Sequence, residues 1–133
     1  MGVRNGLRDG VSVNSSDTEG FTGLHWACAS GHLSIVRILL ACPDIEVNTG
    51  DSSGRTPLMW ACCSSESSEE MVRALLHHPR LTSLNTRDMN GYTAIMWAVE
   101  RGNCSAVQLL VHTPGVDMVT REGWGSYVVE MAR

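Results

Sequence analysis

The chain has 133 residues, a hydrophobic fraction of 43% and a formal net charge of −4, which fit one folded domain rather than a disordered segment. The acidic balance argues against a protein that binds nucleic-acid phosphates, and no apolar run reaches the roughly 18 residues needed to span a bilayer. All 10 basic residues are arginine, so a Schiff-base lysine and a phosphate-binding P-loop lysine are both excluded.

One sequence pattern recurs along the chain. Asp, Gly, Thr, Leu or Ile, Trp and Ala occupy the same offsets in residues 17–27, 51–61 and 88–98. The starts of these stretches are about 34 and 37 residues apart, a period typical of stacked repeat proteins. Each stretch is followed by an apolar segment with helical spacing, at residues 35–40, 71–76 and 106–111.

Two shorter stretches at the ends have the pattern of partial units. Residues 3–14 fit a second helix with its exit loop, and residues 122–132 fit a first helix that stops early. Terminal units of such arrays normally carry a polar outer face, which Val128, Val129 and Met131 do not provide. We therefore expect a segment of a longer array, or one whose ends are covered by a neighbour.

The recurring motif resembles that of the ankyrin repeat. The family pattern Asp-x-x-Gly-x-Thr-Pro-Leu-His-x-Ala is matched most clearly by residues 22–27 and 56–61. The resemblance implies an all-α solenoid of stacked units, each a β-turn followed by two antiparallel helices. A single domain over residues 1–133 would then comprise a partial unit at 1–16, full repeats at 17–50, 51–87 and 88–121, and a partial unit at 122–133.

Local residue choices agree with this unit. Thr56 and Pro57 suit a helix start, because a threonine oxygen caps free amides and proline tolerates the first turn. Gly20, Gly54 and Gly91 stand where a tight turn needs permissive backbone angles. The sequence therefore predicts turns at these glycines and helices that begin just after them.

The histidines form no catalytic pattern. The resemblance implies that His25 bridges to the neighbouring turn, a role kept once because Met59 and Met96 replace the histidine in the other repeats. His77 and His112 fall at the ends of predicted helices, where a cationic form would complement the helix dipole. The sequence places no carboxylate or thiol beside them, so no catalytic residue is expected.

Trp26, Trp60 and Trp97 recur at the same repeat position. One interpretation is an aromatic ladder that stacks on the bases of single-stranded nucleic acid. The other is a core position between the paired helices, where the family normally places an apolar residue. The acidic charge disfavours the first interpretation, and we expect the three indoles to lie in the core.

The five cysteines do not form a metal motif. Cys28, Cys42, Cys62, Cys63 and Cys104 lack the short paired spacing of zinc ligands, and their odd number does not fit a disulfide framework. We expect small core residues, no structural metal and no cofactor. Free thiols fit a reducing compartment, so a cytoplasmic or nuclear protein is expected.

Arg4, Arg37 and Arg73 share one position on the predicted second helices. This stripe along the convex side is either a solvated face or a docking site for an acidic partner. We favour the solvated face.

The segment around Ser67 also has two interpretations. Ser67 and Glu70 have the spacing of a capping box at a helix start. Glu69 and Glu70 also follow Ser67 and Ser68 as in the site of an acid-directed kinase. We favour the capping box, and the two interpretations are compatible because a helix N-terminus tolerates phosphate.

The predicted function is a non-enzymatic protein–protein interaction module. In the family, turn tips and the concave face of the first helices bind partner proteins. The corresponding turn positions are Thr18, Glu19, Phe21, Ser52, Ser53, Arg55, Met89, Asn90, Tyr92, Trp124 and Ser126, with Arg87 and Arg121 just before two of the turns. The corresponding helix positions are Ala29, Ser30, Cys63, Ser64, Glu100 and Arg101.

The large tip residues are expected to carry most of the binding energy. Phe21, Arg55, Tyr92 and Trp124 are residue types that dominate interface energetics. Their side chains are expected to project from the helical stack and to be dispensable for folding.

Two other functions are compatible with the same fold. The chain could be a ligand-sensing or regulatory ankyrin segment of a larger enzyme or channel, which would need polar groups converging in a pocket between units. It could also be a purely structural spacer. The expected partner is another protein, with no nucleic acid, membrane or metal involved.

Overall fold

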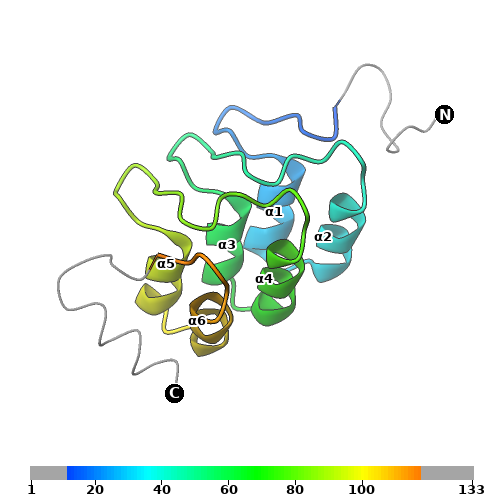
Figure 1. Cartoon of the computed structure of the whole chain (residues 1–133). Helices are drawn as coiled ribbons and strands as arrows, with labels where there is room; N and C mark the ends of the chain where they lie inside the picture. Colours follow the sequence, from blue (N-terminus) through cyan, green and yellow to red (C-terminus); the bar gives the residue numbers. More distant parts are fainter. Residues whose placement is uncertain (1–11, 118–133) are drawn as a thin grey trace.

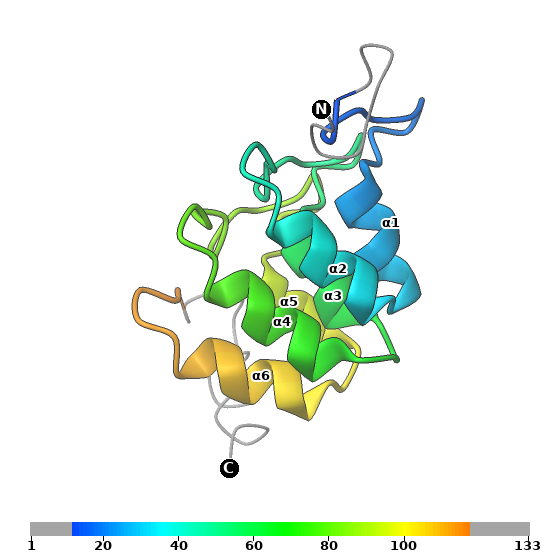
Figure 2. The same ribbon diagram turned by 90° about the vertical axis from the view of Figure 1, so that its right-hand side faces the viewer.

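The structure, a computed structural model, describes residues 12–117. In this part of the chain there are six helices and no strand: α1 Gly23–Ser30, α2 Leu33–Leu40, α3 Pro57–Cys63, α4 Ser68–Leu76, α5 Ala94–Glu100 and α6 Cys104–Val111. The helices α1, α3 and α5 form one layer, and α2, α4 and α6 form the other (Figure 1, Figure 2). The expected all-α solenoid is confirmed, whereas most of the partial unit at 1–16 and all of that at 122–133 lie outside the described residues.

Each first helix follows a tight turn that an aspartate organises. The Oδ1 atoms of Asp17, Asp51 and Asp88 each accept two backbone amides of their own turn, at 2.8 to 3.0 Å. Gly20 completes the first turn with a φ of 78°. A Cβ atom at Gly20 would lie 2.8 Å from the backbone nitrogen of Ser52, so the next turn packs where a side chain would begin. The turns thus lie side by side (Figure 1) and follow the predicted glycine positions.

Threonine caps begin the first helices as predicted. Thr22, Thr56 and Thr93 have extended backbones, and each side chain accepts the amide three residues later, at 3.3 to 3.4 Å. Pro57 occupies the first turn of α3, where its missing N–H costs no hydrogen bond. These caps stabilise helices that are only seven or eight residues long.

The predicted capping box at Ser67 is wrong. Ser67 has a left-handed backbone with a φ of 55°, and its side chain makes no capping bond, because a capping residue needs an extended backbone to reach the free amides. The hydroxyl of the neighbouring Ser68 makes contacts outside its own helix. It donates to the carbonyl of Ala61 at 2.7 Å and accepts from the side chain of Asn103 at 2.7 Å, which ties this loop to the third repeat.

The core fills the space between the two helical layers. It contains apolar side chains from every helix and from the exit loops. Its largest fully buried members include Leu24, Val36, Ile45, Val47, Leu58, Met59, Met71, Leu75, Ile95, Met96 and Leu110.

Two of the cysteines belong to this core. Cys28 and Cys62 are fully buried, and burial raises the pKa of Cys28 to about 12 and that of Cys62 well above its usual value. Both thiols are therefore protonated and unreactive at neutral pH. Cys42 and Cys63 are half-buried, and Cys104 is exposed, so the core interpretation is wrong for Cys104.

A row of asparagines joins the exit loops that follow the second helices. Asn14, Asn48 and Asn85 each donate a side-chain N–H to a backbone carbonyl of the next loop at 2.8 Å. Each side-chain oxygen also accepts at least one backbone amide of that loop, at 2.7 to 3.1 Å. Sequence analysis missed these residues, although each follows an apolar residue at the same repeat position.

The histidine bridge is confirmed. His25 accepts the backbone amide of Thr22 at Nδ1, at 3.1 Å, and its Nε2 lies 3.0 Å from the backbone oxygen of Arg55 in the next turn. Because a carbonyl can only accept, the ring carries its proton on Nε2. Desolvation by burial lowers the pKa of His25, since a second proton would charge a buried ring and displace the Thr22 contact.

This bridge predicts a loss of stability in mild acid. The unfolded chain binds more protons than the folded one between the lowered pKa of His25 and its ordinary value of 6.5. The free energy of unfolding should therefore fall as the pH is lowered through this window. Denaturant titrations between pH 7.5 and 5.5 measure this fall. The free energy of unfolding should depend less steeply on pH in His25→Gln than in the wild type.

The exposed His32 is the matched control for this measurement. His32→Gln should keep the wild-type pH dependence. If His25→Gln kept the wild-type dependence of the free energy of unfolding on pH, the lowered pKa of His25 would not be its cause.

Candidate functional site

The repeated tryptophans lie on the exposed side of the first helices. Trp26 is 55% exposed, so the prediction that it lies in the core is wrong, whereas Trp60 and Trp97 are half-buried and pack against the core. The indole N–H explains this position, because a buried indole needs a hydrogen-bond acceptor and the core offers apolar side chains. We call the surface formed by the exposed sides of α1, α3 and α5 and the preceding turns the inner face.

Each indole is held by the aspartate that organises its own turn. Trp26, Trp60 and Trp97 direct Nε1 to the Oδ2 atoms of the turn aspartates, at 3.4, 3.0 and 2.9 Å respectively. One carboxylate therefore holds the turn with Oδ1 and the indole with Oδ2. The signal in the sequence is a constant spacing, because an aspartate stands nine residues before each tryptophan.

An aromatic side chain fills the gap between the first two indoles. The ring of Phe21 lies 5.0 Å from that of Trp26 and 5.2 Å from that of Trp60, centroid to centroid. Both contacts are edge-to-face, with interplanar angles of 63° and 64°. Such pairs contribute about 0.5 to 1.5 kcal/mol beyond simple burial.

A guanidinium fills the equivalent gap in the next repeat. The Cζ atom of Arg55 lies 5.5 Å from the ring centre of Trp60 and 4.8 Å from that of Trp97, both within the range of a cation–π interaction. Its Nε lies 3.6 Å from the Oδ2 of the buried Asp88. Tyr92 ends the series, with its ring 5.0 Å from that of Trp97.

These side chains form one continuous series across the three repeats. We call it the stacked ladder, and its members in spatial order are Trp26, Phe21, Trp60, Arg55, Trp97 and Tyr92. Phe21, Arg55 and Tyr92 occupy equivalent positions in their turns, so one site per repeat supplies the side chain beside each indole.

The expectation that the large tip residues project from the stack is therefore wrong. Phe21, Arg55 and Tyr92 are half-buried against the indoles. The physical reason is that each turn lies against the tryptophan of its own or the next repeat, so a large side chain there buries more apolar area by packing than by projecting.

The other expected site residues in the described part of the chain fall into an exposed set and a half-buried set. The exposed ones are Thr18, Glu19, Ser30, Ser52, Arg87, Met89, Asn90, Glu100 and Arg101. The half-buried ones are Ala29, Ser53, Cys63 and Ser64. Arg121, Trp124 and Ser126 lie outside the described residues.

One thiol among the expected site residues, Cys63, is not activated as a nucleophile. Burial raises the pKa of Cys63, and a hydrogen bond from Arg101 opposes this shift only in part. A raised pKa keeps this thiol protonated and weakly nucleophilic. Within residues 12–117, no group of three or more histidine, cysteine, aspartate or glutamate side chains is placed to hold a metal ion.

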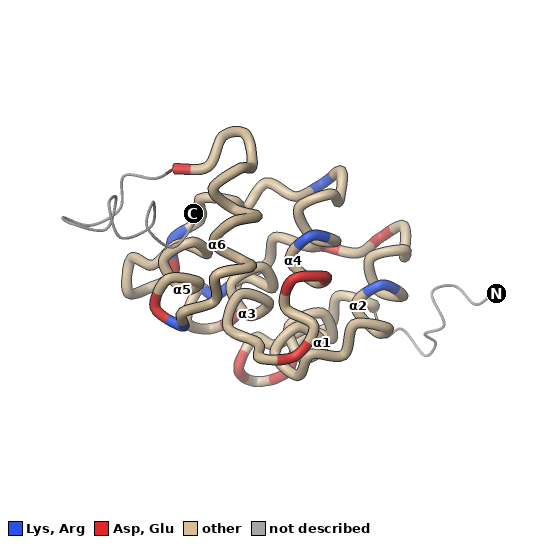
Figure 3. Tube along the Cα trace, turned by 90° about the horizontal axis from the view of Figure 1, so that it is seen from below, with Lys and Arg blue, Asp and Glu red and all other residues tan. Residues whose placement is uncertain are grey.

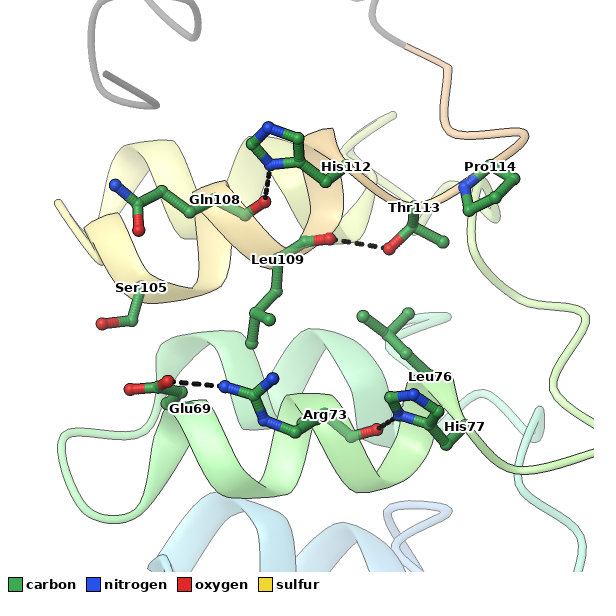
Figure 4. Close-up of a pocket in the computed structure, with 10 residues that line it drawn as sticks. All are labelled: Glu69, Arg73, Leu76, His77, Ser105, Gln108, Leu109, His112, Thr113 and Pro114. Atoms are coloured by element: carbon green, nitrogen blue, oxygen red, sulfur yellow. Dashed lines mark hydrogen bonds and ion pairs between the residues drawn. The ribbon is translucent and has the colours of Figure 1, made fainter.

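A groove of about 810 Å³ lies on the opposite layer, between α4 and α6. Leu76 and Leu109 point into it from the two helices (Figure 4). Some of its polar groups are occupied locally. Arg73 pairs with Glu69 at 2.7 Å, and the Nδ1 atom of His77 lies 2.8 Å from a backbone oxygen of its own helix.

The arginine stripe on this outer layer is sparse. The basic residues of α2 and α4 are drawn in blue in Figure 3. These are the exposed Arg37 and Arg73, and Arg73 is the residue paired with Glu69. Arg4 lies outside the described residues.

Comparison with known proteins agrees with this architecture. A family model for ankyrin repeats in three copies matches residues 3–88 and 65–122. The chain belongs to the ankyrin-repeat family. Ankyrin repeats generally mediate protein–protein interaction, and the family is generally non-enzymatic. No helix in the described part is long and apolar enough to cross a membrane.

Individual relatives match over short stretches. Osteoclast-stimulating factor 1 of Xenopus laevis is 46% identical over 44 residues, which is 33% of this chain and 21% of the relative. Acyl-CoA-binding domain-containing protein 6 of Rattus norvegicus is 53% identical over 32 residues, or 24% of this chain and 11% of that protein. The match therefore spans about a fifth or less of each relative's length.

The stacked ladder predicts that one tip residue stabilises the fold and another does not. Phe21→Ala removes a ring packed between two indoles and should lower the free energy of unfolding by about 2 kcal/mol. Met89→Ala, at a tip position that is 77% exposed, should change it by less than about 0.5 kcal/mol. Guanidinium unfolding followed by circular dichroism measures both, and equal effects would contradict the ladder's structural role.

Proposed function

We propose that the ankyrin array binds a partner protein non-enzymatically through its inner face. The observation that carries this proposal is the stacked ladder, in which tryptophan, tyrosine and arginine lie half-exposed on one continuous surface. These three residue types carry most of the binding energy at protein interfaces. Exposed residues that surround the ladder, including Glu19, Met89 and Arg101, would form the rim of the contact.

Pre-organisation supports the same proposal. The ladder side chains are already fixed by ring contacts and by the indole–carboxylate hydrogen bonds. Side chains that are ordered before binding lose little conformational entropy when a partner arrives. Trp26 has the largest exposed fraction of the three indoles at 55%, which makes it the strongest candidate anchor.

The ligand-sensing alternative has less support. The groove between α4 and α6 would be its natural site, but Glu69 and Arg73 satisfy each other there. A small-molecule site normally has polar groups that converge on the ligand. We therefore favour a protein partner on the inner face.

The proposal is tested with a partner captured by cross-linking to the wild-type chain in a cell lysate. Trp26→Ala should weaken the affinity for the purified partner by about thirtyfold or more, as expected for a truncated interface anchor. Calorimetric titration of the purified proteins gives the dissociation constants.

Ile38→Ala is the matched control, because Ile38 is 65% exposed but lies on α2 in the outer layer. It should leave the affinity unchanged, and melting temperatures recorded in parallel should show both variants folded. Loss of affinity with Ile38→Ala and wild-type affinity with Trp26→Ala would place the partner on the outer layer instead.

A further inference from the structure

We propose that Trp26 and Asp17 form a binding site for an arginine side chain of the partner protein. This inference rests on the proposed function and names the chemistry that the inner face recognises in its first repeat. The third repeat supplies the template, because it already holds a guanidinium, that of Arg55, at the position equivalent to the exposed side of Trp26.

The template consists of an indole, the aspartate that holds it, and a guanidinium from the preceding turn. The Oδ2 atom of Asp88 accepts the indole N–H of Trp97 at 2.9 Å. The same Oδ2 lies 3.6 Å from the Nε atom of Arg55, and the Cζ atom of Arg55 lies 4.8 Å from the ring centre of Trp97. One aspartate–tryptophan unit of this fold therefore holds a guanidinium by stacking and by charge at once.

The first repeat has the same aspartate–tryptophan unit. Asp17 accepts two turn amides with Oδ1 and the indole N–H of Trp26 with Oδ2, as in the template. The hydrogen bonds from the backbone amides of Phe21 and Glu19 lower the pKa of Asp17, so its carboxylate is charged at neutral pH. The first repeat thus presents the same charge and the same ring that Arg55 meets in the third.

The guanidinium of the template has no described counterpart in the first repeat. Within residues 12–117, Phe21 is the only side chain in ring or cation–π contact with Trp26. By contrast, Trp60 and Trp97 each have two such neighbours. The 55% exposed fraction of Trp26, against half-burial of the other two indoles, agrees with this difference.

The charge beside Trp26 favours a cation as the occupant. Asp17 and Glu19 are both exposed, and neither carboxylate makes an ion pair with another residue of the described range 12–117. The face of an indole attracts cations, and neighbouring carboxylates add to that attraction. Arginine fits better than lysine, because a planar guanidinium can stack on the indole and pair with a carboxylate at the same time.

The test uses three tripeptides, acetyl-Gly-X-Gly-amide with arginine, lysine or glutamine as X, titrated into the full chain at low salt. Two-dimensional NMR records the indole N–H signals, and Trp26→Ala identifies the signal of Trp26 by its loss. The arginine tripeptide should shift this signal saturably and bind about tenfold more tightly than the glutamine tripeptide, because it adds a cation–π contact and an ion pair. The lysine tripeptide should have an intermediate affinity.

The Trp97 signal is the internal control. It should not move with any tripeptide, because Arg55 already lies against that ring. A shift of the Trp97 signal equal to that of Trp26 would mean that the tripeptide does not distinguish the two repeats, which contradicts the proposed site.

Carboxylate variants show which charges the arginine meets. Asp17→Asn keeps a side-chain oxygen for the turn amides and should remove the preference for arginine over glutamine. Glu19→Gln should weaken the arginine tripeptide about threefold, and it leaves the turn intact because only the backbone of Glu19 takes part in the turn bonds. The matched control is Glu100→Gln, which changes an exposed carboxylate at the end of α5 and should leave the affinity unchanged. Circular dichroism checks that each variant is folded.

Two further results would overturn the inference. One is equal affinity of the arginine and glutamine tripeptides for the wild-type chain. The other is binding that appears only after Arg4→Gln and Arg8→Gln, which would show that an arginine of the chain itself is the occupant.

The inference and the proposed function can fail separately. If the captured partner protein needs Trp26 while the arginine tripeptide does not shift its signal, the inference fails and the proposed function stands. If the partner does not need Trp26, both fail.

Discussion

The carboxylate of each turn aspartate links the backbone of the turn to the surface of the next helix. In the second repeat, Asp51 holds two amides of its turn with one oxygen and the indole of Trp60 with the other. The same arrangement recurs in the first and third repeats. Because these bonds fix turn and indole together, the side chain at the turn tip has a defined surface on which to pack.

The stacked ladder follows from this link and connects the repeats to one another. Phe21 belongs to the first repeat and packs against Trp60 of the second, and Arg55 of the second packs against Trp97 of the third. A repeat array is stable only through such contacts between neighbours, since one unit cannot bury its apolar face alone. The ladder adds contacts on the exposed side of α1, α3 and α5, whereas the core joins the same helices from within.

The local features were predictable from the sequence because they depend on neighbouring residues. Threonine caps, glycine turns and the His25 bridge follow from a motif of about ten residues, and the structure has each of them. The prediction of a capping box at Ser67 was wrong because the residue types do not reveal that Ser67 has a left-handed backbone.

The candidate surface was predictable only in part. The turns follow from the repeat motif, but the sequence assigns Trp26 to the core and predicts that Phe21 and Arg55 project outward. Their placement depends on contacts between repeats that are more than thirty residues apart in the chain, such as that of Phe21 with Trp60. The signal in the sequence that links these residues is the constant aspartate–tryptophan spacing. It indicates a tryptophan at the surface, because the indole N–H requires an acceptor there.

A double-mutant cycle on Asp51 and Trp60 tests the link between turn and ladder most directly. The free energy of unfolding is measured for the wild type, Asp51→Ala, Trp60→Phe and the double variant. The loss of the turn bonds is common to Asp51→Ala and the double variant, so it cancels from the coupling energy. The hydrogen bond of 3.0 Å to a carboxylate predicts a coupling energy of at least about 1 kcal/mol. A coupling energy below about 0.3 kcal/mol would show that the carboxylate and the indole act independently and would contradict this account.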